Sequence, residues 1–281
     1  MKLRYWGTAA AEGIPAIFCD CAVCRYAWAH GGREIRTRSQ AIVDDRLLID
    51  LNPDSFTHAI QNQVHLGLIH HLLITHTHSD HFAPEELSYR MDHYAHLDPA
   101  DGPLHIYGSA TVGEIVRNLW VHYSRQPADN MIEFHEIRPF ESFSVFDYRV
   151  VAYPARHDPS SGPLMYQITD RTGRTMLYGH DSGPYFDEVW TAMKQSGVQL
   201  NFVSMDCTEG DSDMAYDAHC NLARDIAIRD RMRAEQIAAP DAVFCLNHFS
   251  HNGGHVNYAE FSPIAEAQGF RVAYDSMEVE I

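Results

Sequence analysis

The sequence has no run of about 18 or more apolar residues, the length that a membrane-spanning helix requires. Its first residues, MKLRYWGTAAAEG, lack the apolar stretch of a signal peptide. Low-complexity segments and linker-like stretches are also absent from the sequence. We therefore expect a soluble, cytoplasmic protein without membrane contacts, whose residues 1–281 form a single domain.

Basic side chains are scarce, since 21 Lys and Arg residues stand against 38 Asp and Glu residues, and the formal net charge is −17. A protein this acidic repels polyanions over most of its surface, so we expect no nucleic-acid polymer among its partners. A small anionic substrate is compatible with this charge, because bound divalent cations can reverse the sign of the potential in one pocket. The sequence leaves open whether the chain forms a homodimer.

Segments typical of strands and of helices alternate along the chain. We expect strands at 2–8, twice within 39–51, and at 70–75, 104–108, 132–137, 143–153, 164–169, 175–179, 201–207, 242–248 and 270–281. We expect helices at 54–63, 84–96, 110–123, 184–197, 220–235 and 258–269. Both halves begin with strands and continue with mixed strands and helices, which predicts two packed β-sheets with helices outside, an α/β sandwich.

The segment THTHSDH, residues 75–81, directly follows the predicted strand 70–75. His76 and His78 are two residues apart, so in an extended segment both imidazoles point to the same side and can reach one metal ion. Asp80 and His81 follow a turn and can reach a second ion nearby. Such nitrogen and oxygen ligands suit Zn²⁺, Mn²⁺ or iron better than Ca²⁺ or Mg²⁺. The alternative, a histidine-rich loop without metal, is disfavoured by this spacing.

A site for two metals needs further ligands from distant parts of the chain. His157, Asp181 and His248 each follow a predicted strand, as the first motif does. A carboxylate can bridge two ions, so Asp181 suits a bridging position. Its neighbour His180 is the alternative ligand.

Three of the six cysteines lie within six residues in a C-x-C-x₂-C pattern, namely Cys19, Cys21 and Cys24. In a cytoplasmic protein such a group is typical of metal ligands, and three thiolates need a fourth ligand to complete a tetrahedral zinc site. We predict His251 as this ligand, because a turn could direct His248 to the first site and His251, three residues later, to the cysteines. Cys245 and His255 are the alternatives.

The order of the predicted catalytic ligands resembles that of the metallo-β-lactamase superfamily. The hallmark of this superfamily is the motif HxHxDH, which residues 76–81 match, followed by a single His, an Asp and a final His. The resemblance implies an αββα sandwich of two mixed β-sheets flanked by helices. The glycine that usually follows the family motif has no counterpart in HFAPEE. By this resemblance, one metal is held by His76, His78 and His157, the other by Asp80, His81 and His248, and Asp181 contacts both.

Several further segments are similar to the PhnP family, the cyclic ribose-phosphate phosphodiesterases of the carbon–phosphorus lyase pathway. They are GTAAAEGIPAIFCDCAVC, MDC at 205–207, AHCNL at 218–222 and NHFSH at 247–251. The resemblance implies a structural zinc on the three cysteines and His251, and a general-acid role for His219. The cysteine pattern also resembles PqqB of pyrroloquinoline quinone biosynthesis, a branch that tends to lose part of the catalytic ligand set, all of which is present here.

We therefore expect a metal-dependent phosphodiesterase that hydrolyses a small cyclic or nucleotide-like phosphodiester by a metal-bridged hydroxide. Its cofactors would be two divalent metals, Zn or Mn, and one structural Zn. Asp80 and His219 are the predicted catalytic residues, because Asp80 holds a metal and His219 can give a proton to the leaving alkoxide. A histidine bonded to backbone at a helix start is the alternative for His219. We expect Asp206 to support a metal ligand and Asp217 to cap the following helix.

The alternatives on the same fold are tRNA 3′-end processing, hydrolysis of a lactam or thioester, and a non-catalytic biosynthesis or carrier protein. The tRNA alternative requires a basic docking element, which this acidic sequence lacks. The complete set of predicted ligands argues against the non-catalytic alternative.

Overall fold

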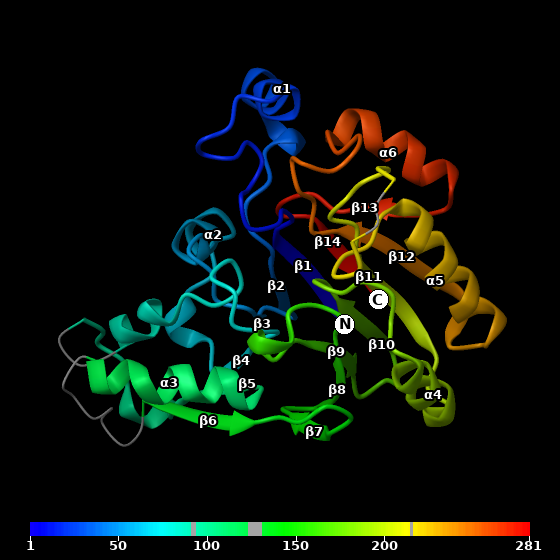
Figure 1. Ribbon diagram of the computed structural model, residues 1–281. Helices are drawn as coiled ribbons and strands as arrows, with labels where there is room; N and C mark the ends of the chain where they lie inside the picture. Colours follow the sequence, from blue (N-terminus) through cyan, green and yellow to red (C-terminus); the bar gives the residue numbers. More distant parts are fainter. Residues whose placement is uncertain (91–93, 123–130, 214–215) are drawn as a thin grey trace.

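The computed structural model describes residues 1–90, 94–122, 131–213 and 216–281. In these residues the chain forms two seven-stranded β-sheets that pack face to face, with helices on both outer faces (Figure 1). The expected αββα sandwich is therefore confirmed. None of the described helices is long and apolar enough to cross a membrane.

The first sheet combines antiparallel and parallel pairing. Its spatial order is β14 (Glu278–Glu280), β1 (Lys2–Gly7), β2 (Gln40–Val43), β3 (Leu47–Ile49), β4 (His71–Leu73), β5 (Leu104–Gly108) and β6 (Ile132–Glu136). Strands β3 to β6 are parallel to one another, whereas β14, β1, β2 and β3 pair antiparallel. The expected hairpin joins β2 to β3 through Asp44 and Asp45, which both take the left-handed conformation that aspartate tolerates better than most residues.

The second sheet is also mixed. Its spatial order is β13 (Arg271–Val272), β12 (Ala238–Asn247), β11 (Leu200–Asp206), β10 (Thr175–Gly179), β9 (Leu164–Thr169), β8 (Tyr148–Pro154) and β7 (Ser142–Val145). Strands β10 to β13 are parallel, and β7 to β10 pair antiparallel.

Six α-helices and five short 3₁₀ helices connect the strands in the described residues. The α-helices are α1 (Ala22–His30), α2 (Ser55–Gln61), α3 (Ala110–His122), α4 (Asp187–Ser196), α5 (Leu222–Ala234) and α6 (Tyr258–Ala267). The 3₁₀ helices are η1 (Gly32–Glu34), η2 (Leu66–Leu68), η3 (Pro84–Arg90), η4 (Pro99–Asp101) and η5 (Pro159–Ser161). Figure 1 shows α2 and α3 beside the first sheet and α4, α5 and α6 beside the second.

The alternation of side chains along each strand separates three apolar layers. Leu47 and Ile49 of β3 face the second sheet and belong to the core between the sheets. Leu48, between them, faces outward and packs in a cluster with Val112 and Val116 of α3. A third cluster buries the helices α4, α5 and α6 against the outer face of the second sheet. The site-bearing loops thus extend from two sheets whose inner and outer faces both carry buried apolar clusters.

Three of the expected elements differ from the structure. The segment 84–96 forms the 3₁₀ helix η3 as far as Arg90, and its residues 91–93 lie outside the described part. The segment 143–153 is two strands, because the chain turns at Phe146, which has a φ of 52°. The segment 270–281 divides between the two sheets: β13 pairs with β12 and β14 pairs with β1, with Ser276 at a φ of 67° between them.

The strand directions bring the predicted ligands to one edge of the sandwich. Strands β8, β10, β11 and β12 run in the same direction, so their carboxyl ends lie at the same edge of the second sheet. The carboxyl end of β4 meets this edge, because the carbonyl oxygen of Thr75 accepts a 2.9 Å hydrogen bond from the backbone nitrogen of Leu164, the first residue of β9. The loops that follow these strands therefore converge.

Candidate metal centres

The structure brings the seven predicted catalytic ligands together in two adjoining groups. Within each group the potential ligand atoms lie within 4.8 Å of one another. The first group is His76, His78 and His157, and the second is Asp80, His81, Asp181 and His248.

The first group contains only imidazoles. His157 Nε2 lies 3.0 Å from His78 Nδ1, and the rings of His76 and His78 are 4.7 Å apart, so the three rings face a common point. Asp181 adjoins this group, because its Oδ2 is 3.7 Å from His76 Nε2 and its Oδ1 is 3.9 Å from His157 Nε2. The carboxylate of Asp181, which we expect to bridge two ions, thus contacts the first group as well as the second group, to which it belongs.

Three distances within the second group match the spacing of a metal coordination shell. Ligand atoms of a tetrahedral zinc site with nitrogen and oxygen ligands are about 3.3 Å apart. His81 Nε2 lies 3.3 Å from His248 Nε2 and 3.3 Å from Asp80 Oδ2, and His248 Nε2 lies 3.1 Å from Asp181 Oδ2. Two contacts depart from this spacing, since His81 Nε2 lies 2.5 Å from Asp181 Oδ2 and His248 Nε2 lies 4.0 Å from Asp80 Oδ2. A cation bound among these atoms therefore requires shifts of about 0.8 Å.

Two of these ligands sit at sharp backbone turns. Asp181 has a φ of 48° and His248 a φ of 64°. These values lie in the left-handed region of backbone conformation, which residues other than glycine rarely adopt. The turn at Asp181 is held by its backbone nitrogen, which donates a 3.0 Å hydrogen bond to Asp206 Oδ2 at the end of β11. Backbone strain of this kind collects at functional sites, where the surrounding structure maintains it.

The charges of the site favour a cation at its centre. Burial would lower the pKa of His81, but the carboxylates of Asp181, Asp80 and Asp50 raise it well above its usual value. Burial would raise the pKa of Asp181, yet the imidazoles of His248 and His81 hold it well below its usual range. The pKa of His76 is lowered well below its usual value, first by burial, so its imidazole is a neutral ligand.

A buried polar atom supports the same interpretation. His76 Nε2 has no hydrogen-bond partner among the described residues, although an unpaired buried polar group is costly. A metal ion held by the first group would satisfy this atom. The residues therefore fit a pair of divalent transition metals, whose preferred ligands are imidazole nitrogen and carboxylate oxygen.

Asp50 supports the site, although the sequence interpretation missed it. It is fully buried and accepts a 2.7 Å hydrogen bond from His81 Nδ1, which leaves His81 Nε2 to face the cluster. The backbone nitrogen of Thr75 donates to the same carboxylate at 2.8 Å. Burial raises the pKa of Asp50 although His81 opposes it. The sequence offered one indication of this role, because Asp50 directly follows the apolar strand β3. The candidate metal ligands likewise follow strands.

Two more side chains contact the imidazole nitrogens of candidate ligands that face away from the ligand groups. Thr208 Oγ1 lies 2.8 Å from His248 Nδ1, and Asp158 Oδ2 lies 3.3 Å from His78 Nε2. These contacts define the ring orientations of His248 and His78, as outer hydrogen bonds to metal-bound imidazoles do.

His219 lies beside the two groups. Its Nδ1 is 3.1 Å from Asp206 Oδ2 and 3.5 Å from Asp181 Oδ1, and its ring is 5.0 Å from that of His157. Burial would lower its pKa, but Asp206 raises the pKa of His219 to about 9. Asp206 thus favours the protonated form of this imidazole.

Asp217 and His180 differ from their expected roles. The cap of α5 is Asn221, whose side chain accepts from the backbone nitrogen of Arg224 at 3.0 Å, so the prediction of Asp217 as the cap was wrong. Asp217 instead forms a 2.8 Å ion pair with Arg224. His180 is buried with its Nε2 2.6 Å from Ser204 Oγ, and it belongs to none of the ligand groups that the described residues form.

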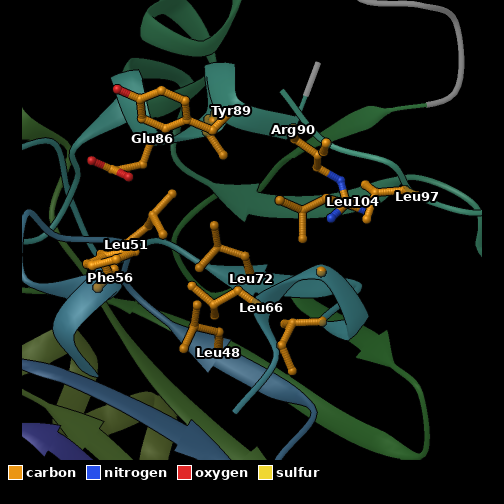
Figure 2. Close-up of a pocket in the computed structure, with 15 residues that line it drawn as sticks. Leu48, Leu51, Phe56, Leu66, Leu72, Glu86, Tyr89, Arg90, Leu97 and Leu104 are labelled. Carbon is orange, nitrogen blue, oxygen red and sulfur yellow. The ribbon is translucent and has the colours of Figure 1, made fainter. Parts of the chain in front are cut away.

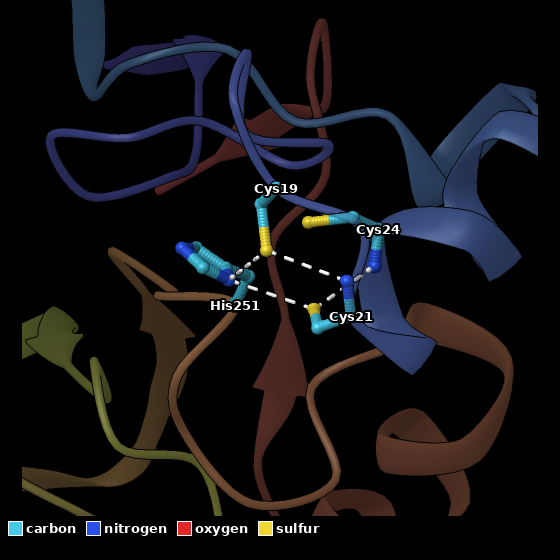
Figure 3. Close-up of side chains that lie close together, drawn as sticks. All are labelled: Cys19, Cys21, Cys24 and His251. Carbon is cyan, nitrogen blue, oxygen red and sulfur yellow. Dashed lines mark hydrogen bonds between the residues drawn. The ribbon is translucent and has the colours of Figure 1, made fainter.

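The cysteine cluster includes the predicted histidine (Figure 3). Cys19 Sγ and Cys21 Sγ lie 3.4 Å and 3.6 Å from His251 Nδ1. In a tetrahedral zinc site a sulfur and a nitrogen ligand are about 3.6 Å apart, so these distances suit a zinc ion. The fourth group is the thiol of Cys24, which accepts from the backbone nitrogen of Ala16 at 3.3 Å.

The cysteine side chains differ in acidity within this cluster. Burial would raise the pKa of Cys21, but hydrogen bonds from the backbone of Cys24 and from His251 lower it to about 6. Burial raises the pKa of Cys24 to about 12. The two alternative ligands lie elsewhere: Cys245 is buried between the sheets, and His255 Nδ1 is 2.9 Å from Asp211 Oδ2.

A model of the beta-lactamase superfamily domain matches residues 45–239, which is more than half of the chain. The chain belongs to the beta-lactamase superfamily. No curated protein matches the sequence significantly.

Solved structures share the fold of this superfamily member over its whole length. Zinc-bound PqqB from Methylobacterium extorquens has 20% identity and a TM-score of 0.77 over 100% of both chains. A diphosphatase from the PhnP family has 18% identity and a TM-score of 0.75 over 100% of this chain and 97% of its own. The short form of human tRNase Z has 17% identity and a TM-score of 0.69 over 100% of this chain and 99% of its own. At these identities the similarity shows the fold alone.

Two cavities differ in their relation to the metal ligands. A cavity of about 410 Å³ adjoins the first group, since His157 is among its lining residues. Its other walls come from residues 136–139, 154–155 and 162–164, from η5, from the start of α3 and from Phe186. An apolar cavity of about 610 Å³ lies on the outer side of the first sheet, between α2, η2 and η3 (Figure 2). None of the candidate ligands lines this second cavity, so the smaller one is the candidate substrate pocket of this superfamily member.

Proposed function

We propose that this chain is a metal-dependent phosphodiesterase that hydrolyses a small cyclic or nucleotide-like phosphodiester. The observation that carries the proposal is the position of Asp181. Its carboxylate contacts ligands of both groups, and the imidazole of His219 lies 3.5 Å away. A two-metal arrangement with an adjacent proton donor suits the cleavage of a phosphate ester that has a poor leaving group.

Some side chains of the site would orient the metal ligands, and others would transfer a proton. When bound, two divalent cations would supply Lewis acidity, a lowered pKa of water and the positive charge that attracts an anionic diester. Asp50 and Thr208 hold His81 and His248 in the orientation that directs Nε2 to the centre. Asp206 engages His219 Nδ1, so the Nε2 proton of His219 is the one available to a leaving alkoxide.

The pocket beside His157 supports a small substrate. A volume of about 410 Å³ lies within the usual range for small-molecule sites. The net charge of −17 disfavours a long polyanion as partner of the protein as a whole, so the proposal includes no nucleic-acid polymer. It includes no membrane partner either.

The test combines metal analysis with turnover. The full chain would be analysed for zinc, manganese and iron, then assayed with bis-p-nitrophenyl phosphate and with a panel of cyclic phosphates and nucleotides. Cleavage that stops when the metals are chelated and returns when they are restored would support the proposal. Bound metal without cleavage of any phosphodiester would contradict it, and would favour the carrier role or another ester class.

A further inference from the structure

A further group of potential metal ligands lies on the first sheet, apart from the two groups around Asp181 and from the cysteine cluster. It consists of His105 on β5 and of Glu133 and His135 on β6, and its ligand atoms lie within 4.8 Å of one another. The two strands are parallel, with His105 opposite Glu133 and Tyr107 opposite His135. Residues two apart on a strand share a face, so the three side chains project from the same side of the sheet.

The group lies at the other end of the sheet from the proposed catalytic centre. His71 begins β4 and pairs with His105 near the start of β5, whereas the THTHSDH segment follows the end of β4. Parallel strands have their amino ends on one side of the sheet and their carboxyl ends on the opposite side. This group therefore lies away from the catalytic groups, and it shares no ligand with them.

Its distances match those of a coordination shell. His105 Nδ1 lies 3.0 Å from His135 Nε2 and 3.4 Å from Glu133 Oε2, and His135 Nε2 lies 3.7 Å from Glu133 Oε1. Nitrogen and oxygen ligands of a tetrahedral zinc ion are about 3.3 Å apart. His105 Nδ1 and His135 Nε2 face different oxygens of Glu133. This arrangement suits a carboxylate that binds an ion through both oxygens.

Aromatic stacking holds both imidazoles in place. The ring of His105 stacks on His71 at 4.9 Å and 18°, and the ring of His135 stacks on Tyr107 at 4.6 Å and 15°. His71 Nδ1 in turn lies 3.1 Å from the hydroxyl of Tyr107. The two ligand rings are thus fixed by their neighbours before any ion arrives, which reduces the entropy lost on binding.

The exposure of the group allows an ion to enter. The side chains of His105, His135 and Glu133 are 27%, 31% and 55% exposed, so a water molecule can complete the coordination.

We propose that His105, Glu133 and His135 form a separate site for one divalent transition-metal ion, with solvent as the remaining ligand. Two imidazoles and one carboxylate favour Zn²⁺, Ni²⁺ or Cu²⁺ over Mg²⁺ and Ca²⁺. Because β6 is the edge strand of the first sheet, the ion would tie this edge to β5. The proposal does not depend on the phosphodiesterase activity.

The test counts metal ions in the full chain with its tightly held metals retained. Zn²⁺ would be titrated calorimetrically into the wild type, His105→Gln, His135→Gln and a control, His30→Gln, whose histidine is exposed at the end of α1. We expect wild type and His30→Gln to bind one more equivalent than either site variant. Unchanged stoichiometry in both site variants would overturn the proposal, as would loss of the extra equivalent in the control.

A spectroscopic readout keeps the test decisive if a variant loses stability. Cu²⁺ added to the wild type should give an electron paramagnetic resonance spectrum with coupling to two imidazole nitrogens. This signal should fall to one nitrogen in the folded site variant. A wild-type spectrum without two-nitrogen coupling at the added equivalent would refute the site.

Discussion

Asp181 is the residue that joins the two candidate ligand groups, because its carboxylate oxygens face imidazoles of both. Its left-handed backbone and the hydrogen bond from its nitrogen to Asp206 hold the carboxylate in this position. A bridging carboxylate contributes to the affinity for both ions, so its loss affects the pair rather than one ligand position.

Asp181→Ala should lose at least one catalytic metal and most of the hydrolytic rate. Metal content would be measured by elemental analysis after gel filtration, together with turnover of the diester. Asp241→Ala, at an exposed position of β12, is the matched control and should retain both metals. An Asp181→Ala protein with two metals and a normal rate would refute the bridging role.

Asp50→Asn should weaken the second group while the fold persists. The substitution keeps the size of the side chain but removes the charge that stabilises His81. Loss of such an outer partner lowers metal affinity by about 10–100-fold. Competition with a chelator would measure it, with the exposed Asp45→Asn as control. Equal affinities in the two variants would show that Asp50 does not act on the metal.

His219→Ala should separate substrates by leaving group. A proton donor matters for a poor leaving group and little for p-nitrophenolate, which leaves without protonation. We expect a loss of about 10²–10⁴-fold with an alkyl leaving group and a far smaller loss with the nitrophenyl ester. Asp217→Asn, in the same loop, is the control. Equal losses on both substrates would argue against the role of acid.

At the scale of elements, the segment between β1 and α1 and the first turn of α1 supply the three cysteines of the cluster. Cys21 is the cap of α1, since its sulfur accepts from the backbone nitrogen of Cys24 at 3.5 Å, so one residue begins the helix and contributes a ligand. His251 comes from the loop after β12, three residues beyond His248. One short loop therefore connects the cluster with the catalytic groups.

Cys21→Ser should lower the melting temperature and the structural zinc content more than the activity of each folded molecule. Zinc in a closed cysteine and histidine site contributes directly to folding. Calorimetry and zinc analysis would be compared with the rate per catalytic metal. Cys245→Ser is not a suitable control because it is buried, so the exposed Asp20→Ser serves instead. A normal melting temperature with full zinc would contradict the prediction.

At the scale of the whole molecule, acid stability depends on buried histidines as well as on metal release. His58 is fully buried on α2, with its Nδ1 2.6 Å from Gln40 Oε1 and its Nε2 2.6 Å from Thr37 Oγ1. Burial lowers the pKa of His58 to about 4. The unfolded chain therefore takes up a proton at a higher pH than the folded chain does.

The contribution of His58 to stability is complete above its unfolded pKa of about 6.5 and is lost as the pH falls through about 4. The loss amounts to about 3 kcal/mol of unfolding free energy. Urea denaturation should show a shallower decline from pH 7 to pH 4.5 in His58→Gln than in the wild type. His30→Gln, exposed on α1, should follow the wild type. Parallel curves for wild type and His58→Gln would contradict the shift.

The candidate site could be predicted from the sequence where its ligands are close along the chain. His76, His78, Asp80 and His81 lie within six residues after an apolar strand, so local geometry limits how far apart they can be. The cysteines of the C-x-C-x₂-C pattern are subject to the same limit. The αββα sandwich also followed from the order of strands and helices and from the family resemblance, because apolar periodicity reports which faces are buried.

The tertiary structure decided the contacts between distant residues. Asp50 meets His81 because β3 and β4 are parallel neighbours, and His105 meets His135 because of the register between β5 and β6. The last segment divides between two sheets for the same reason, since strand pairing depends on where other strands already lie. Local sequence sets the period and direction of side chains, but register and packing are properties of the assembled chain.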